Sequence, residues 1–519
     1  MAIQLPGARR SPELLAARDR HRLWDVVPVF VVLLVYCWCY TNLAAWLGAP
    51  TPGACVDWLG LALPRVVDDD GDFHAKLHVS FTGLLDGDDE RLVVFAALFG
   101  CFLTTYFLPL RHKAKAAVLW FVPAFAALYG WQPTLQLVAA HLAIYGSFHA
   151  RALGEGRGVR ALRWALVQSC MLTIAAGCLM NGVTGAAWKL PVGLVFFFYQ
   201  WARLMVYHAD FRDGLVPRDL EVFDHLALFL TPVAIANVGY APYLGQGHAY
   251  LQGRLLAQDK SALVRSGVRL WLLALVYMLF AEQAVAWFID GVRRVWGIPV
   301  YAFTAELVRE HLRGAPLSTP TVLLSTLVDQ ARIFLIYGGV THFRVGAWRV
   351  MGYAVDTQYD RPWLATNLAN LWGRFAFHFR DFLVRVFYYP VFFKMFRRRP
   401  LLRIFFATMV ATVGGNLIWG HVPPKTITAL TWGSLTTILS TWPYFVLLGL
   451  GISLTQMFLA TRPRTRRPWT RDRRLVLDVV CAYLTLQYFA LIHVFIRPQP
   501  GGTLADSARL VLIGLGLGA

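Results

Sequence analysis

The chain has 519 residues, of which 57% are hydrophobic and 15% are charged, and its formal net charge is +19. A soluble domain has about 25% charged residues, so this composition excludes an ordinary soluble protein and indicates that lipid is the solvent. The positive charge does not predict a nucleic-acid partner, because Arg and Lys lie in short clusters between apolar runs, as in cytoplasmic loops that face anionic lipid.

Apolar runs long enough to cross a bilayer, about 20 residues each, recur along the whole chain. The predicted membrane segments are 24–47, 92–110, 116–131, 133–150, 160–181, 186–207, 222–244, 268–290, 319–343, 401–421, 427–458 and 475–495, and a shorter apolar stretch occupies 508–518. The sequence therefore predicts an all-α, polytopic membrane protein with about 11–13 membrane helices.

The charges of the connecting loops predict an orientation and a division of the chain. Loop 50–91 is acidic, whereas loops 111–115, 151–163 and 462–474 are basic. The positive-inside rule then places the N-terminus in the cytoplasm and loop 50–91 outside. We divide the chain into N-terminal membrane helices (1–165), a catalytic core (166–425) and C-terminal membrane helices (426–519).

Two segments in the middle of the chain are too polar to cross lipid alone. They comprise residues 245–267 and 344–400, and the second is rich in Trp, Phe and Tyr. Irregular or polar backbone at membrane depth persists only where protein or a water-filled cavity surrounds it. We expect re-entrant or interfacial helices here, around a central chamber.

His421 is the sharpest candidate for chemistry, because an ionisable residue at a membrane helix is costly and indicates function. It ends the apolar run 404–422, with Gly414, Gly415 and Asn416 shortly before it. The glycines would allow a close approach, and the Asn416 amide could hydrogen-bond a substrate. Such a histidine suits general-base catalysis on a hydroxyl group; a histidine that merely caps the helix end at the membrane interface is the alternative.

A second constellation occupies residues 359–390, where charges alternate with aromatic residues. On one helix His378 would share a face with Asp381, and Arg374 with His378, because residues three or four apart are neighbours. An amphipathic helix at the membrane surface, with no catalytic role, explains the same pattern.

These segments resemble the membrane-bound O-acyltransferase family, particularly bacterial members that acylate polysaccharides and envelope polymers. The string YDRPWLATNLANLWGRF is similar to the family's FNRPYLATSIxxFWRRW signature, and Arg380-Asp381-Phe382 is similar to its Arg-Asp-Tyr. Residues 190–210, LPVGLVFFFYQWARLMVYHAD, resemble a segment that precedes these, and IWGHV resembles the helix with the family's catalytic histidine. Ala376 stands where polysaccharide-acylating members have a histidine after the first motif.

The resemblance implies a reaction and roles for residues. A thioester donor, acyl-CoA or an acylated carrier protein, gives its acyl group, most simply acetyl, to a hydroxyl of a polysaccharide or envelope lipid, with no cofactor or metal. The resemblance implies that His421 is the base and that His378 and Asn416 orient the reacting groups. The substrate-binding residues would be Arg361, Trp372, Arg374, Arg380 and Asp381. Relatives often work with a periplasmic partner protein, so the resemblance implies that one is plausible here. The high Arg and Ala content, separately, suggests a bacterial inner membrane.

Two other functions remain open from the sequence. A transporter or flippase for an envelope lipid or polymer would use Asp, Arg and His as a relay, but its usual internal repeats are not evident. A membrane glycosyltransferase would show paired acidic residues in an outer loop, for which residues 68–72 are a faint candidate.

Overall fold

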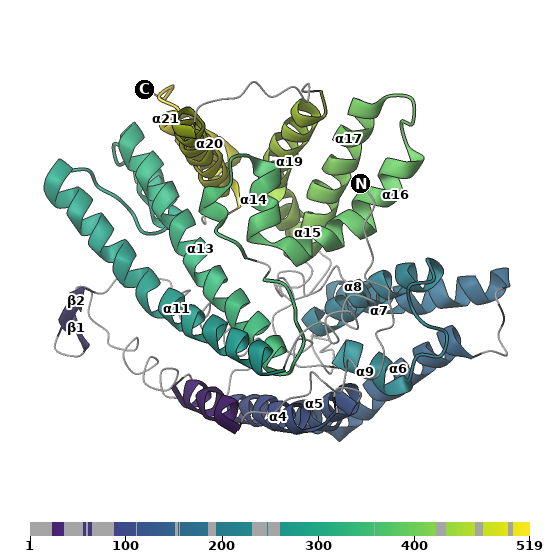
Figure 1. The fold of residues 1–519 in the computed structure, drawn as a ribbon. Helices are drawn as coiled ribbons and strands as arrows, with labels where there is room; N and C mark the ends of the chain where they lie inside the picture. The colour runs from purple at the N-terminus through teal and green to yellow at the C-terminus, as the bar shows by residue number, and fades with distance from the viewer. Residues whose placement is uncertain are drawn as a thin grey trace.

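The computed structural model describes a defined part of the chain, and every structural statement below refers to that part. It comprises residues 23–35, 55–58, 61–64, 88–109, 112–150, 154, 156–184, 194–230, 247, 260–357, 359–421, 432–461, 471–496 and 502–518. Apart from one β-hairpin, every regular element in it is a helix (Figure 1). The prediction of an all-helical architecture is confirmed, and its physical reason is that only a helix satisfies its backbone polar groups within one segment.

The N-terminal elements extend to residue 230. They are the 3-10 helix η1 (Leu23–Asp25), the apolar helix Val26–Val35, the strands β1 (Cys55–Trp58) and β2 (Leu61–Pro64), and the helices α4 (Asp88–Phe107), α5 (Lys113–Tyr129), α6 (Trp131–His149), α7 (Arg157–Thr184), α8 (Leu194–Arg212) and α9 (Val222–Leu230). The strands pair antiparallel, with Cys55 opposite Pro64. They lie in the predicted outer loop 50–91.

The second group begins at residue 260. It contains α11 (Lys260–Trp296), α12 (Thr304–Leu312), α13 (Thr319–Val350), the 3-10 helix η6 (Pro362–Leu364), α14 (Leu368–Phe375), α15 (Phe377–Leu383), the π-helical turn η7 (Val384–Tyr388), α16 (Tyr389–Lys394), α17 (Pro400–Met409), the π-helical turn η8 (Val410–Gly415), α18 (Asn416–His421), α19 (Trp432–Thr461), α20 (Arg471–Ile492), the 3-10 helix η9 (His493–Phe495) and α21 (Leu504–Gly514).

Four helices in the described residues are long and apolar enough to cross a membrane. They span Thr319–Val350, Pro400–Ile418, Thr441–Thr461 and Leu475–Phe495. These coincide with four of the predicted membrane segments, and together they indicate a multi-pass membrane protein. The described parts of the other predicted segments do not meet the same criterion, so the predicted number of 11–13 membrane helices is higher than the four candidates found here.

The long helices α11 and α13 lie side by side (Figure 1). Two glycines allow this close approach, because a Cβ at Gly267 would come 2.7 Å from the Gly346 carbonyl oxygen, and one at Gly346 would come 2.9 Å from that of Gly267. The Trp271 indole also donates to the Phe343 carbonyl oxygen over 2.9 Å. This pair forms one wall of a continuous apolar core.

Side chains from each of the three predicted divisions enter that core. Phe102 of α4, Phe229 of α9, Phe382 of α15 and Phe489 of α20 are all buried members. Burial of such aromatic side chains makes the main favourable contribution to the free energy of packing inside a protein. The segment with the family-like motifs, from α14 to α18, therefore packs into the centre of the molecule.

Candidate active site

The motif segment 359–390 is a succession of short elements. Arg361, the residue before η6, has a φ of 44°, which lies in the left-handed region. The segment then continues through η6, α14, α15, η7 and α16. The helix breaks at Ala376, where φ is −145° and ψ is 60°. The expectation of one amphipathic surface helix is therefore wrong. Arg374 and His378 lie on different helices, so the face that a continuous helix would give them does not exist.

His378 is fully buried at the start of α15. Its exposed fraction is 0%, and its Nε2 lies 3.1 Å from the carbonyl oxygen of Asp356. Because a carbonyl oxygen can only accept, Nε2 carries the proton, and in a neutral ring Nδ1 is then an acceptor. His378 and Asp381 share α15, as predicted. The structure thus places an imidazole with a defined tautomer inside the protein.

Arg380 and Asp381 form an ion pair next to His378. Arg380 Nη2 lies 2.8 Å from Asp381 Oδ1, and the guanidinium lies 4.9 Å from the ring centre of Phe377. A Cβ at Gly373 would come 2.8 Å from Arg380 Nη1, so glycine at that position leaves room for the guanidinium. Both charges are partly exposed, 35% and 18%, which leaves the pair accessible to a charged substrate group.

Arg374 ties the start of the motif to α14. Its Nη1 lies 3.3 Å from Asp360 Oδ2, and its Nε donates to Asn370 Oδ1 over 2.7 Å. Trp372 is half-buried, and its ring lies 6.3 Å from that of Phe379. Of the predicted substrate-binding residues, Arg361 is exposed, and the others surround the junction between α14 and α15.

The third motif lies on α18, which continues from α17 through η8. Asn416 is 4% exposed, and its amide nitrogen donates to the Thr412 carbonyl oxygen over 2.7 Å. A Cβ at Gly415 would come 2.5 Å from Leu383 and 3.2 Å from Phe387, whereas one at Gly414 would meet nothing within 4 Å. The predicted close approach is therefore real at Gly415 alone. His421 is the last residue of α18, and its side chain lies outside the described residues.

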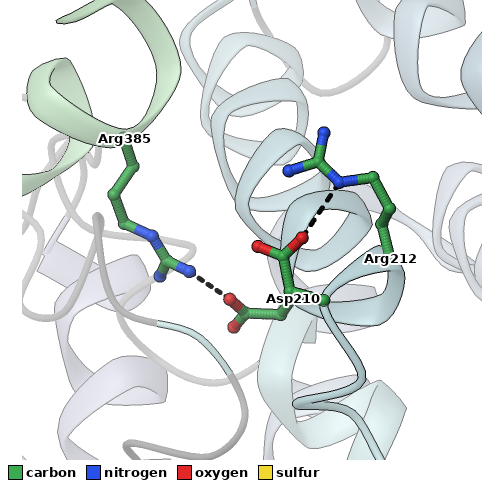
Figure 2. Close-up of polar contacts among 4 residues, drawn as sticks. Asp210, Arg212 and Arg385 are labelled. Atoms are coloured by element: carbon green, nitrogen blue, oxygen red, sulfur yellow. Dashed lines mark hydrogen bonds and ion pairs between the residues drawn. The ribbon is translucent and has the colours of Figure 1, made fainter. Parts of the chain in front are cut away.

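An ion pair that the sequence analysis missed joins α8 to η7. Arg385 extends toward Asp210 (Figure 2), and Arg385 Nη2 donates to Asp210 Oδ1. The Asp210 side chain is 2% exposed and that of Arg385 is 25% exposed. Neighbouring Arg212 instead pairs with Asp213 over 3.0 Å. The sequence signal for this pair was Asp210 itself, an acidic residue near the end of the apolar helix α8.

Burial dominates the electrostatics of Asp210. It raises the pKa of the carboxyl above its usual value, and Arg385 and then Arg203 oppose that shift. The backbone of Gly247 packs directly against the carboxylate, since a Cβ at that position would overlap it. The carboxylate is therefore enclosed by a cation on one side and by backbone on another.

No family model matches this chain, and no curated protein matches it. The resemblance to the O-acyltransferases therefore rests on the motif residues alone.

Proposed function

We propose that this chain is a membrane-bound O-acyltransferase. It would move an acyl group, most simply acetyl, from a thioester donor to a hydroxyl of a polysaccharide or envelope lipid. One observation supports this more than any other. Residues 382–387 of α15 and η7, which belong to the motif segment 359–390, contact the resembling segment 190–210 and the turn η8 that leads into α18.

The contacts come from the segment 190–210 on one side and from η8, just before α18, on the other. Trp201, in the segment 190–210, lies 6.2 Å from Phe382 between ring centres. Asp210, at the end of the same segment, pairs with Arg385. Gly415, just before α18, packs on Leu383 and Phe387. Chance resemblance of unrelated segments gives no reason for them to meet, whereas an active site assembled from several helices requires it.

The proposed chemistry assigns a step to each group. His421 removes the proton of the acceptor hydroxyl as its oxygen bonds to the thioester carbonyl carbon. The carbon–sulfur bond then breaks, and the thiolate leaves and takes up a proton. His378, with its fixed tautomer, and Asn416 orient the reacting groups. The Arg380–Asp381 pair and Arg374 bind charged parts of the substrates.

The proposal includes a location. The four candidate spans indicate a multi-pass membrane protein. From the high Arg and Ala content we infer a bacterial inner membrane, and from the loop charges a cytoplasmic N-terminus. A donor from the cytoplasm and an acceptor of the envelope fit this placement, and a periplasmic partner protein could present the acceptor.

Transport has less support. The buried charges that a transporter would need include Asp329 and Arg332, 3.1 Å apart in the candidate span α13. Asp329 Oδ2, however, accepts hydrogen bonds from the Thr304 amide at 3.1 Å and the Thr304 hydroxyl at 2.6 Å. It therefore holds the first turn of α12 onto α13, which is a structural role.

Transfer of labelled acyl groups in membranes tests the proposed function. Membranes with wild type, His421→Ala or the control His311→Ala, a histidine of α12 outside the motifs, would be incubated with radiolabelled acetyl-CoA and, in parallel, palmitoyl-CoA. Label released by hydroxylamine measures the esters formed. We expect ester label in wild type and His311→Ala, and none above background in His421→Ala. Equal label in all three membranes would remove His421 from the mechanism, and no label from either donor in wild type would contradict acyl transfer from CoA.

A further inference from the structure

The turn between α16 and α17 carries a dense group of positive charges. Lys394, Arg397, Arg398 and Arg399 are all exposed there. We call residues 394–399 the basic turn. It ends where the candidate span Pro400–Ile418 begins, so it lies at the boundary of the hydrocarbon layer.

The chain supplies no acid to neutralise this turn from its own region. Between Asp381 and Asp472 the sequence contains no Asp or Glu, but it contains twelve Arg and Lys residues. In the described residues, none of the four cations of the basic turn has an ion pair, whereas exposed arginines elsewhere do. Arg294, for example, pairs with Asp290 over 2.6 Å, and Arg313 pairs with Glu310 over 2.6 Å.

The basic turn has a defined shape, which a loose charged loop would not have. Phe396 adopts a φ of 48°, a left-handed conformation that a bulky side chain adopts only where its surroundings enforce it. Its ring packs edge-on against Phe406 at 5.3 Å. Arg397 Nε donates to the Phe393 carbonyl oxygen over 3.1 Å, and the Arg403 guanidinium lies 4.2 Å from the ring centre of Phe392. Arg398 and Arg399 take no part in these side-chain contacts, and both are exposed.

Exposed aromatic side chains flank the cations. Tyr389 is 40% exposed, Phe393 is 61% exposed and Phe396 is 38% exposed. Aromatic residues with adjacent Arg and Lys are typical of the level of lipid headgroups, where rings contact acyl chains and cations contact phosphates.

We propose that the basic turn binds the phosphates of anionic phospholipid headgroups. The proposal stands independently of the acyl-transfer function, because it depends only on charge, exposure and the position of the span. A soluble phosphate compound would explain the cations but not the exposed rings beside them.

Lipid binding measured by native mass spectrometry tests this. Purified full-length protein in a neutral detergent would be titrated with dioleoyl-phosphatidylglycerol, and separately with dioleoyl-phosphatidylcholine. The test variant is Arg398→Gln/Arg399→Gln, which keeps the packing contacts of Phe396 and Arg397. The matched control is Arg294→Gln/Arg313→Gln, which removes the same charge from arginines that already have acidic partners.

We expect wild type and the control to prefer phosphatidylglycerol. In the test variant the affinity for phosphatidylglycerol should fall by about 30-fold, because each of the two lost cations contributes roughly fivefold to binding of an anionic lipid. Arg398→Lys/Arg399→Lys should keep the wild-type affinity.

Equal phosphatidylglycerol affinity in the test variant and wild type would overturn the proposal. Acetyl-CoA would be titrated in parallel. If the test variant lost acetyl-CoA binding while its phosphatidylglycerol binding was unchanged, the proposal would be overturned as well, because the site would then serve a soluble phosphate. If the test variant fails to fold, Arg398→Gln alone should still weaken phosphatidylglycerol binding by about fivefold. Unchanged phosphatidylglycerol binding in this single variant would also overturn the proposal.

Discussion

Asp210 and Arg385 form an ion pair across 175 residues of sequence, and it connects α8 to the π-helical turn η7. The acid is almost fully buried, so its charge depends on this partner. A π-helical turn inserts an extra residue into a helix and is frequently found at functional sites. Here it places Arg385 against α8 while Phe387 of the same turn packs against Gly415.

Asp210→Asn should destabilise the protein by about 3 kcal/mol, because removing one partner of a buried pair leaves the other charge uncompensated. Thermal unfolding in detergent measures the effect. Asp213→Asn is the matched control, since its carboxylate is 50% exposed and pairs with the exposed Arg212; it should change stability by less than about 1 kcal/mol. Similar losses in both variants would show that the Asp210 pair has no special structural weight.

Gly415→Ala should lower stability by about 1–3 kcal/mol and reduce ester formation, because its methyl group would force Leu383 and Phe387 away from η8. Gly414→Ala provides the comparison, with open space around its Cβ, and it should match wild type or be slightly more stable. Unfolding temperature and ester label should both be measured. If Gly414→Ala were the more harmful change, the packing of Leu383 and Phe387 on Gly415 of η8 would be incorrect.

The start of α21 should loosen in acid. Hydrogen bonds from Thr503, first that of its side chain, lower the pKa of Asp506 below its usual value. A lowered carboxyl pKa stabilises the folded state above the unfolded pKa of about 3.9, and this contribution is lost as the pH falls through the lower folded value. The protection factors of the α21 amides, which are the intrinsic exchange rates at each pH divided by the measured rates, should therefore be lower at pH 3 than at pH 5. Asp506→Asn should abolish the difference, and a difference that persists in this variant would assign the effect to another group.

Residues 398 and 517 should lie on opposite faces of the membrane. Between them the chain contains three candidate spans, Pro400–Ile418, Thr441–Thr461 and Leu475–Phe495, and an odd number of crossings changes sides. Arg398→Cys and Leu517→Cys, each in a chain without its seven native cysteines, would be labelled with an impermeant maleimide in sealed vesicles. A permeant maleimide gives the total. Labelling of both positions from the same side would mean that one of the three helices does not cross.

Local sequence was sufficient for part of the site. Asn416 and Gly415 lie in the helix that their apolar neighbours predict, and His378 shares α15 with Asp381 because their spacing is a property of any helix. The break at Ala376 was not predictable in this way, because the strongest helix-disfavouring residue between 368 and 383 is Gly373, which lies within α14 before the break. Phe375 and Phe379 are both buried, so the break occurs within the core, where packing outweighs local preference.

The sequence by itself determined that the chain is helical and suited to a membrane, because apolar run length and charge are properties of single segments. The sequence also contained the motifs that resemble the O-acyltransferase family. Only the tertiary structure decided that Asp210 meets Arg385, that Gly415 rather than Gly414 allows close packing, and that Arg374 and His378 belong to separate helices. Each of these relationships depends on contacts between segments that are far apart in the sequence. The hydrophobic periodicity of one segment does not specify which other segment it will contact.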